Sequence, residues 1–194
     1  MTLHLPRIRS TPLVLVLVTL LLAVLTATPA SASDINIERA EAYVANDLVM
    51  LDVDAGFTFS EDAIDALSSG IALTFDLEVS ISEVRRFLWD RELFTTRRQF
   101  SLERHALSNQ FVLSDLITGE RRIHPSLDGA IADLGRIRRL PLTDRGDLQD
   151  AGRLACSVRL RLDMNALPAP MIPLAYVSPG WHMSSGWHRW PTDL

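Results

Sequence analysis

The residues that could support catalysis or metal binding are few and poorly spaced. The candidate histidines are His105, His124, His182 and His188, and none occurs in an H-E-x-x-H or C-x-x-C pattern. Ser184 and Ser185 lie between His182 and His188, but no G-x-S-x-G motif surrounds them. Gly-rich phosphate-binding motifs are also absent from the sequence. We therefore predict a protein that is not an enzyme and that needs no cofactor and no metal.

Cys156 is the only cysteine, so an intrachain disulfide is excluded. It alternates with the apolar residues Leu154, Val158, Leu160 and Leu162. This position predicts a small buried hydrophobic side chain rather than a reactive thiol.

All 19 basic residues of the chain are Arg, and none is Lys. Four Arg-Arg dipeptides occur, and Arg159 and Arg161 share one face of an expected strand. If several strands presented arginines to one face, they would form a ridge that binds an anion or a partner. Alternatively, the arginines pair across strands with acidic residues such as Asp76 and Glu78. We prefer the pairing.

The C-terminal segment contains three of the four tryptophans. Such residues can anchor a partner or can cap the open end of the packed sheets. We prefer the cap, with Trp187 structural and Trp190 more exposed. The candidate partner-binding residues are Arg159, Arg161, Trp181, Trp187, Arg189 and Trp190.

These side chains must be positioned by strands, and the clearest strand is residues 71–81, I-A-L-T-F-D-L-E-V-S-I. Strict alternation predicts one buried face and one solvated face. On this view Phe75→Asp is strongly destabilising, whereas Asp76→Ser is nearly neutral. Residues 154–162 form the second clear strand. Between residues 83 and 91 the alternation is lost, which leaves a strand end and a loop as alternatives.

Two short helices interrupt the strands. Each follows a serine that has an acidic residue two positions after it: Ser60 precedes a helix that ends at Gly70, and Ser126 precedes one that ends at Gly135. Ile64 and Leu67 are expected to dock the first helix on the sheet. The prolines of residues 167–173 predict an extended, polyproline-like crossing. The expected fold class is α+β, mainly antiparallel β, as a sandwich or half-open barrel with two short helices and about seven to nine strands.

The first residues resemble an export signal. His4, Arg7 and Arg9 precede an apolar run from Leu13 to Leu25, and the segment ends in A-S-A at residues 30–32. We predict a signal peptide at residues 1–32, cleaved after Ala32, and a single periplasmic domain at residues 33–194; an uncleaved anchor is the alternative. Cleavage would change the formal net charge from −5 to −7, since residues 1–32 contain two arginines and no acidic residue. This charge argues against nucleic acid and an anionic membrane surface as partners.

Several local patterns resemble a known family. They are F-T-F-S at 57–60, G-I-A-L at 70–73, L-R-L-D at 160–163, L-P-A-P at 167–170 and W-H-M-S-S-G-W at 181–187. Together they resemble a proteobacterial family of exported proteins, catalogued as a domain of unknown function, number four-three-nine-zero. The resemblance implies an envelope location in a Gram-negative cell, with no activity and no catalytic residues. Genes of this family often lie near a membrane sensor-kinase gene, which suggests a link to such a kinase.

The sequence therefore favours a non-enzymatic envelope protein that binds a protein partner, without a membrane span after cleavage. The alternative is a carrier or binder of a small or lipidic ligand. A pocket inside the sheet would favour the carrier, and an exposed Trp/Arg patch would favour the partner-binding protein. The oligomeric state is left open.

Overall fold

The computed structural model describes residues 34–194, so the predicted signal peptide, its cleavage site and the boundary at residue 32 lie outside the described residues. Within this part the strands are β1 (Asp34–Ala45), β2 (Leu48–Thr58), β3 (Leu73–Glu83), β4 (Arg91–His105), β5 (Gln110–Asp115), β6 (Arg121–His124), β7 (Arg136–Asp144), β8 (Leu154–Leu162) and β9 (His188–Thr192). The helices are α2 (Glu61–Ser68), α3 (Leu127–Leu134) and α4 (Ile172–Val177), with short 3-10 turns η1 (Arg145–Leu148), η2 (Met164–Ala166) and η3 (Pro179–Trp181).

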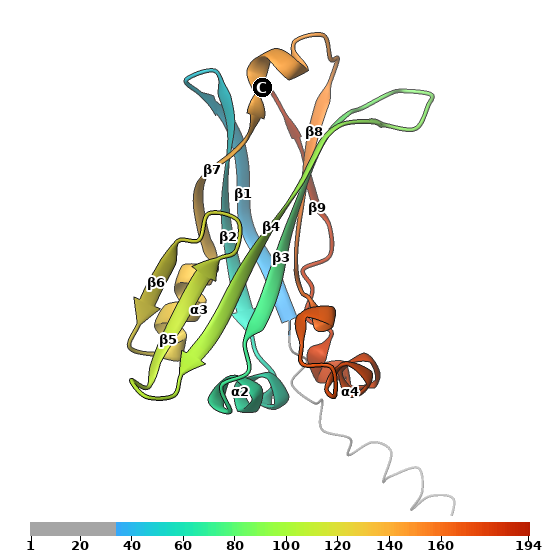
Figure 1. Cartoon of the computed structure of the whole chain (residues 1–194). Helices are drawn as coiled ribbons and strands as arrows, with labels where there is room; N and C mark the ends of the chain where they lie inside the picture. Colours follow the sequence, from blue (N-terminus) through green and yellow to red (C-terminus); the bar gives the residue numbers. More distant parts are fainter. Residues whose placement is uncertain (1–33) are drawn as a thin grey trace, which may run out of the picture. The chain divides into compact units, whose positions relative to one another are not determined.

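The strands form two antiparallel sheets, and the expected α+β class with mainly antiparallel β is confirmed. One sheet has the order β1-β2-β7, and the other has the order β6-β5-β4-β3-β8-β9 (Figure 1). The β1–β2 hairpin closes at Asn46 and Asp47, both with positive φ, as a tight two-residue turn requires. Register shifts interrupt β1 between Ile37 and Arg39 and also interrupt the β2–β7 pairing.

Strand β3 lies at the centre of the larger sheet, between β4 and β8. Its apolar residues Leu73, Phe75, Leu77, Val79 and Ile81 are fully buried. Phe75 packs edge-on against Phe57 of β2 at 5.5 Å between ring centroids, so aromatic contacts join the two sheets. Fully burying each such side chain contributes about 1.5–3 kcal/mol, which makes β3 a main source of core stability.

The opposite face of β3 differs from the sequence-based expectation. Thr74 is nearly buried and Asp76 is 0% exposed, so this face is not simply solvated. The alternation correctly identified five core residues of β3, but Ile71 lies before the strand and is only partly buried. The alternation also could not show what covers the polar residues. The arginine side chains that cover Asp76 come from β4 and β8, which are far away in the sequence.

The two predicted helices are present with the predicted caps. The hydroxyl of Ser60 accepts from the Ala63 N–H at 3.2 Å, and that of Ser126 accepts from the Gly129 N–H at 3.2 Å. Leu67 is fully buried, but Ile64 is partly exposed, so the expectation that Ile64 docks α2 was wrong. A Cβ at Gly135 would collide with the Ala55 carbonyl oxygen, which explains why glycine ends α3 beside β2.

The proline-rich segment also requires a correction. We expected residues 167–173 to be extended, but Leu167 is followed by a turn and then by α4, with Pro173 in its first turn. Proline is compatible with that position because the N–H groups of a first helical turn have no intrahelical partner. Helix α4 and η3 lie near α2, at the end of the sheets where β3 begins (Figure 1).

Candidate interaction surface

The face of the larger sheet that points away from the core carries alternating charges on three adjacent strands. In the antiparallel register, Glu78 of β3 lies opposite Arg97 of β4 and Arg159 of β8. Asp76 lies opposite Arg161 of β8. Opposite charges at facing positions attract each other across the strands, so the register itself brings these groups together.

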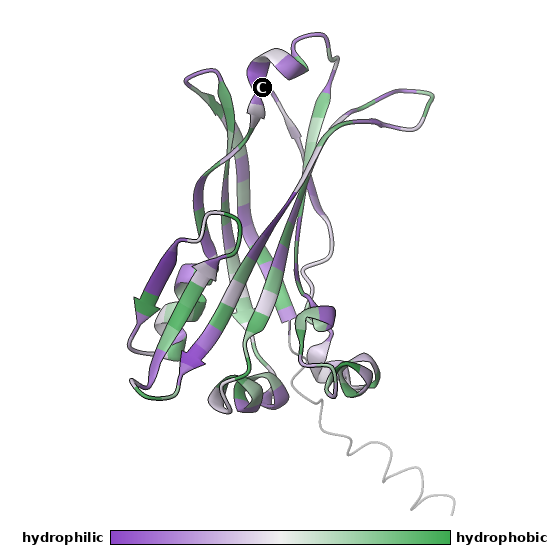
Figure 2. Ribbon diagram, viewed as in Figure 1, coloured by the Kyte–Doolittle hydropathy of each residue, from purple (hydrophilic) through white to green (hydrophobic). Residues whose placement is uncertain are grey.

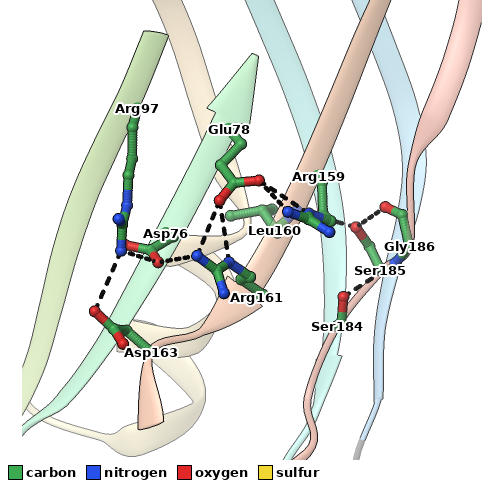
Figure 3. Close-up of polar contacts among 10 residues, drawn as sticks. All are labelled: Asp76, Glu78, Arg97, Arg159, Leu160, Arg161, Asp163, Ser184, Ser185 and Gly186. Atoms are coloured by element: carbon green, nitrogen blue, oxygen red, sulfur yellow. Dashed lines mark hydrogen bonds and ion pairs between the residues drawn. The ribbon is translucent and has the colours of Figure 1, made fainter. Parts of the chain in front are cut away.

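The resulting arginine–carboxylate network contains Asp76, Glu78, Arg97, Arg159, Arg161 and Asp163 (Figure 3). The carboxylate of Asp76 contacts Arg97, lies 3.3 Å from Arg161 and accepts a 3.0 Å hydrogen bond from Gln99. Glu78 accepts from Arg159 at 3.0 Å and from Arg161 at 3.1 Å.

Arg97 also contacts Asp163 at 3.2 Å. Its hydrogen bond to Asp76 is the main cause of its raised pKa, so Arg97 stays charged. The network contains three guanidinium groups and three carboxylates. Its formal charge is therefore balanced when all six groups are ionised.

The four Arg-Arg dipeptides of the chain follow the same principle. One arginine of each dipeptide forms an ion pair with an acidic residue: Arg85 with Glu83, Arg97 with Asp76, Arg122 with Asp133 and Arg138 with Asp54. The structure therefore shows pairing rather than an uncompensated ridge for anions.

Trp187 adds an aromatic group to this face. The guanidinium carbon of Arg159 lies 4.6 Å from the centroid of the Trp187 ring, which is a cation–π distance. The Trp187 side chain is nevertheless 51% exposed. We expected Trp187 to cap the core, and this expectation was wrong, because the segment before it turns the indole onto the sheet face.

The position of Trp187 is fixed by hydrogen bonds between the C-terminal segment and β8. The Ser185 N–H donates to the Leu160 carbonyl at 2.9 Å, and the Ser185 hydroxyl accepts from the Leu160 N–H at 3.0 Å. Ser184 forms an isolated bridge with Arg161. Gly186 then adopts a positive φ of 64°, which allows the chain to turn. The Ser184-Ser185 pair therefore positions Trp187.

Of the other three candidates, two face the core, and Arg189 lies on the outer face opposite Ser157 in the β8–β9 register. Trp181 is 3% exposed and belongs to the core. Trp190 is half-buried against the core, 5.5 Å from the His188 ring, so our expectation that it would be the more exposed tryptophan was wrong. Arg189 forms an ion pair with Asp90 at 2.5 Å. The structure thus brings Arg159, Arg161 and Trp187 together but separates them from Trp181 and Trp190.

Several of the groups considered for catalysis make structural contacts in the part of the chain that the structure describes. Cys156 is buried, and burial raises the pKa of its thiol to about 12, which opposes thiolate formation. His124 lies 2.9 Å from Asp133 and joins β6 to α3. Among residues 34–194, no group of three or more His, Cys, Asp or Glu side chains is arranged to hold a metal ion.

Hollows occur at both ends of the sheets. One of about 530 Å³ is lined by η1, the start of β8 and the C-terminus, where Arg145, Arg153 and Asp193 mix with Leu148 and Leu154. A smaller and more apolar hollow of about 260 Å³ lies between α2 and α4. Both hollows lie at the ends of the sheets and outside the network.

One exposed feature was missed at the sequence level. Phe87, Leu88 and Trp89 lie in the loop between β3 and β4, and all three are exposed. The sequence did contain a signal, because three consecutive large apolar residues break the alternation of the preceding strand. The sequence left a strand end and a loop as alternatives for this region, and the structure shows a loop.

The fold and this surface define an α+β protein with two antiparallel sheets and a charge-balanced, tryptophan-bearing outer face. Residues 32–191 match the family described as a domain of unknown function (DUF4390), and the chain belongs to this family. The family description assigns no activity. Comparisons with curated proteins and with solved structures gave no significant match. Within residues 34–194, no helix is long and apolar enough to span a bilayer.

Proposed function

We propose that this chain is a non-enzymatic protein of the cell envelope that binds a protein partner through the surface around Trp187 and Arg159. The observation that carries the proposal is the half-exposed indole of Trp187, held against Arg159 while Arg159 is itself bound to Glu78. Exposed tryptophan and arginine are the residue types most enriched at binding hot spots. The periplasmic location and a link to a membrane sensor kinase are parts of the same proposal, based on the N-terminal sequence and the family resemblance.

Preorganisation supports a binding role for Trp187 and Arg159. The hydrogen bonds of Ser185 fix the backbone before Trp187, and two contacts with Glu78 and Trp187 restrain the Arg159 side chain. A partner would therefore lose little side-chain entropy when it covers the indole, which favours affinity. As a ligand for this charge-balanced network, a protein surface is more suitable than a free anion, because the network has no excess positive charge.

The non-enzymatic part of the proposal rests on how the reactive side chains are used. The Cys156 thiol is buried, and the Ser185 hydroxyl donates to the Gly186 carbonyl at 2.8 Å while accepting from Leu160. Carriage of a small or lipidic ligand is less well supported. The larger hollow is lined by Arg145, Arg153 and Asp193 in addition to leucines, whereas lipid sites are predominantly apolar.

The test is affinity capture from an envelope extract with the immobilised mature protein, compared with a Trp187→Ala variant. Tyr176 in α4 offers a matched control, because its side chain is 50% exposed and Trp187 is 51% exposed. We expect capture of a specific protein by the wild type and by Tyr176→Ala, and its loss with Trp187→Ala. Equal capture by Trp187→Ala would refute the assignment of this surface, provided that all three proteins melt alike.

A further inference from the structure

The loop between β3 and β4 presents a hydrophobic hairpin tip, which we define as residues 84–90. Phe87 is 88% exposed, Leu88 70% and Trp89 95%. The hairpin projects away from the rest of the larger sheet (Figure 1), and Figure 2 shows hydrophobic residues at this tip. Water-exposed residues of this size usually occur singly, so three in succession at a protruding turn indicate a contact surface.

The base of the hairpin tip is firmly attached to the sheet. The Val84 N–H donates to the Arg153 carbonyl at 2.7 Å, and the Gly152 N–H donates to the Glu83 carboxylate at 3.0 Å. Asp90 accepts from the Arg85 N–H at 3.3 Å and forms an ion pair with Arg189 at 2.5 Å. The apolar side chains are thus held outward by a fixed base.

The charges beside the tip are suited to lipid head groups. From Val84 to Arg91 there are three arginines and one aspartate. Arg85 and Arg91 pair with Glu83, and Asp90 pairs with Arg189, so Arg86 is the cation of this segment without an acidic partner among the described residues. The guanidinium of Arg86 lies 5.6 Å from the centroid of the Phe87 ring, so a cation flanks the apolar group directly. Aromatic residues with adjacent arginines are typical of the boundary between lipid head groups and acyl chains.

The size of the tip also favours a bilayer over a protein. Large aromatic side chains bury about 150–250 Å² each, so Phe87 and Trp89 together with the smaller Leu88 could cover about 500 Å². A stable protein interface needs about 800 Å² from each partner. A bilayer has no such requirement, because a few apolar side chains can insert reversibly.

We infer that the hairpin tip inserts into the interfacial region of a lipid bilayer, with Phe87, Leu88 and Trp89 among the acyl chains and Arg86 at the phosphates. This contact is independent of the Trp187 surface and goes beyond the proposed partner binding. The acidic chain as a whole is repelled by anionic lipid, so insertion of the apolar residues drives the contact and Arg86 orients it.

The test is flotation of the mature protein with vesicles of equal parts phosphatidylcholine and phosphatidylglycerol, alongside the Leu88→Ser/Trp89→Ser double variant. Leu107 is the matched control, because it is 95% exposed at the β4–β5 turn, at the other end of β4. We expect the wild type and Leu107→Ser to float with the vesicles, and the double variant to lose at least tenfold in partitioning. Wild-type binding should also shift the Trp89 fluorescence to shorter wavelength, and Trp89→Phe should remove this shift.

Two results would overturn the inference. One is a wild-type protein that stays unbound at saturating lipid, and the other is equal flotation of the wild type and the double variant. Concentration-dependent self-association lost in the double variant, without vesicle binding, would instead assign the tip to a second copy of the chain. The exposure of the tip residues means that thermal melts of all variants should match the wild type, so misfolding can be separated from lost binding.

Discussion

Replacing Asp76 by Asn tests whether the arginine–carboxylate network stabilises the fold. Asp76 is 0% exposed, whereas its partners Arg97 and Arg161 have side chains that are 45% and 35% exposed. Removing one member of a fully buried ion pair costs about 3–5 kcal/mol. Water can reach both arginines and replace part of the lost contact, so we expect a smaller loss, about 2 kcal/mol. The alternation of β3 considered alone predicts almost no change for a substitution at this position.

The assay is thermal unfolding of the Asp76→Asn protein. For a domain of this size, 2 kcal/mol corresponds to a decrease of about 4–8 °C in Tm. Ser80→Ala is the control on the same face of β3 and should change stability by less than about 0.5 kcal/mol. Combining Asp76→Asn with Arg97→Gln should cost less than the sum of the single changes, because the two residues share one interaction. A Tm equal to that of the wild type would refute the reasoning and restore the simple picture of a solvated face.

Three further experiments test particular packing arguments. Trp181→Ala removes a buried side chain and should cost about 3–5 kcal/mol in urea unfolding, whereas Trp187→Ala should cost less than about 1 kcal/mol. Equal losses would contradict the assigned burial. Gly135→Ala forces a Cβ into the Ala55 carbonyl and should lower the stability of the fold by about 1–3 kcal/mol, which is the range for overpacking. An unchanged melt would argue against this close approach. The Cys156 thiol, with a pKa raised to about 12, should resist alkylation at about pH 8 until urea unfolds the protein, and rapid labelling of the native state would contradict its burial.

Local patterns in the sequence were sufficient to identify the main elements. Period-two alternation located β3 and β8, and serine caps with a following glycine located α2 and α3. These signals depend on neighbouring residues only, so they can be interpreted without knowledge of the tertiary structure. They failed at α4, where a cluster of prolines suggested an extended chain although Pro173 occupies the one part of a helix that accepts it.

The candidate site was only partly predictable, because it depends on contacts between distant segments. Pairing of Glu78 with Arg159 and Arg161 follows once β3 and β8 are neighbours, and the sequence suggested these partners. The burial of Asp76 could not be deduced, since it needs arginines from both flanking strands. Trp187 and Trp190 are three positions apart in an extended segment, so they face opposite sides of the sheet, and which of them faces the core depends on the register of β9 on β8.

The outer strands of both sheets restrict how any other chain can associate with this protein. An unprotected edge invites a further strand through backbone hydrogen bonds, which leads to swapping or fibrils. Here β7 contains Pro141 and β9 contains Pro191, which lack an N–H to donate, and β1 is interrupted by its bulge. The fourth edge, β6, has only four residues and carries Arg121 and Arg122. Strand addition is therefore disfavoured at all four described edges, and the protein should resist amyloid-like aggregation at high concentration.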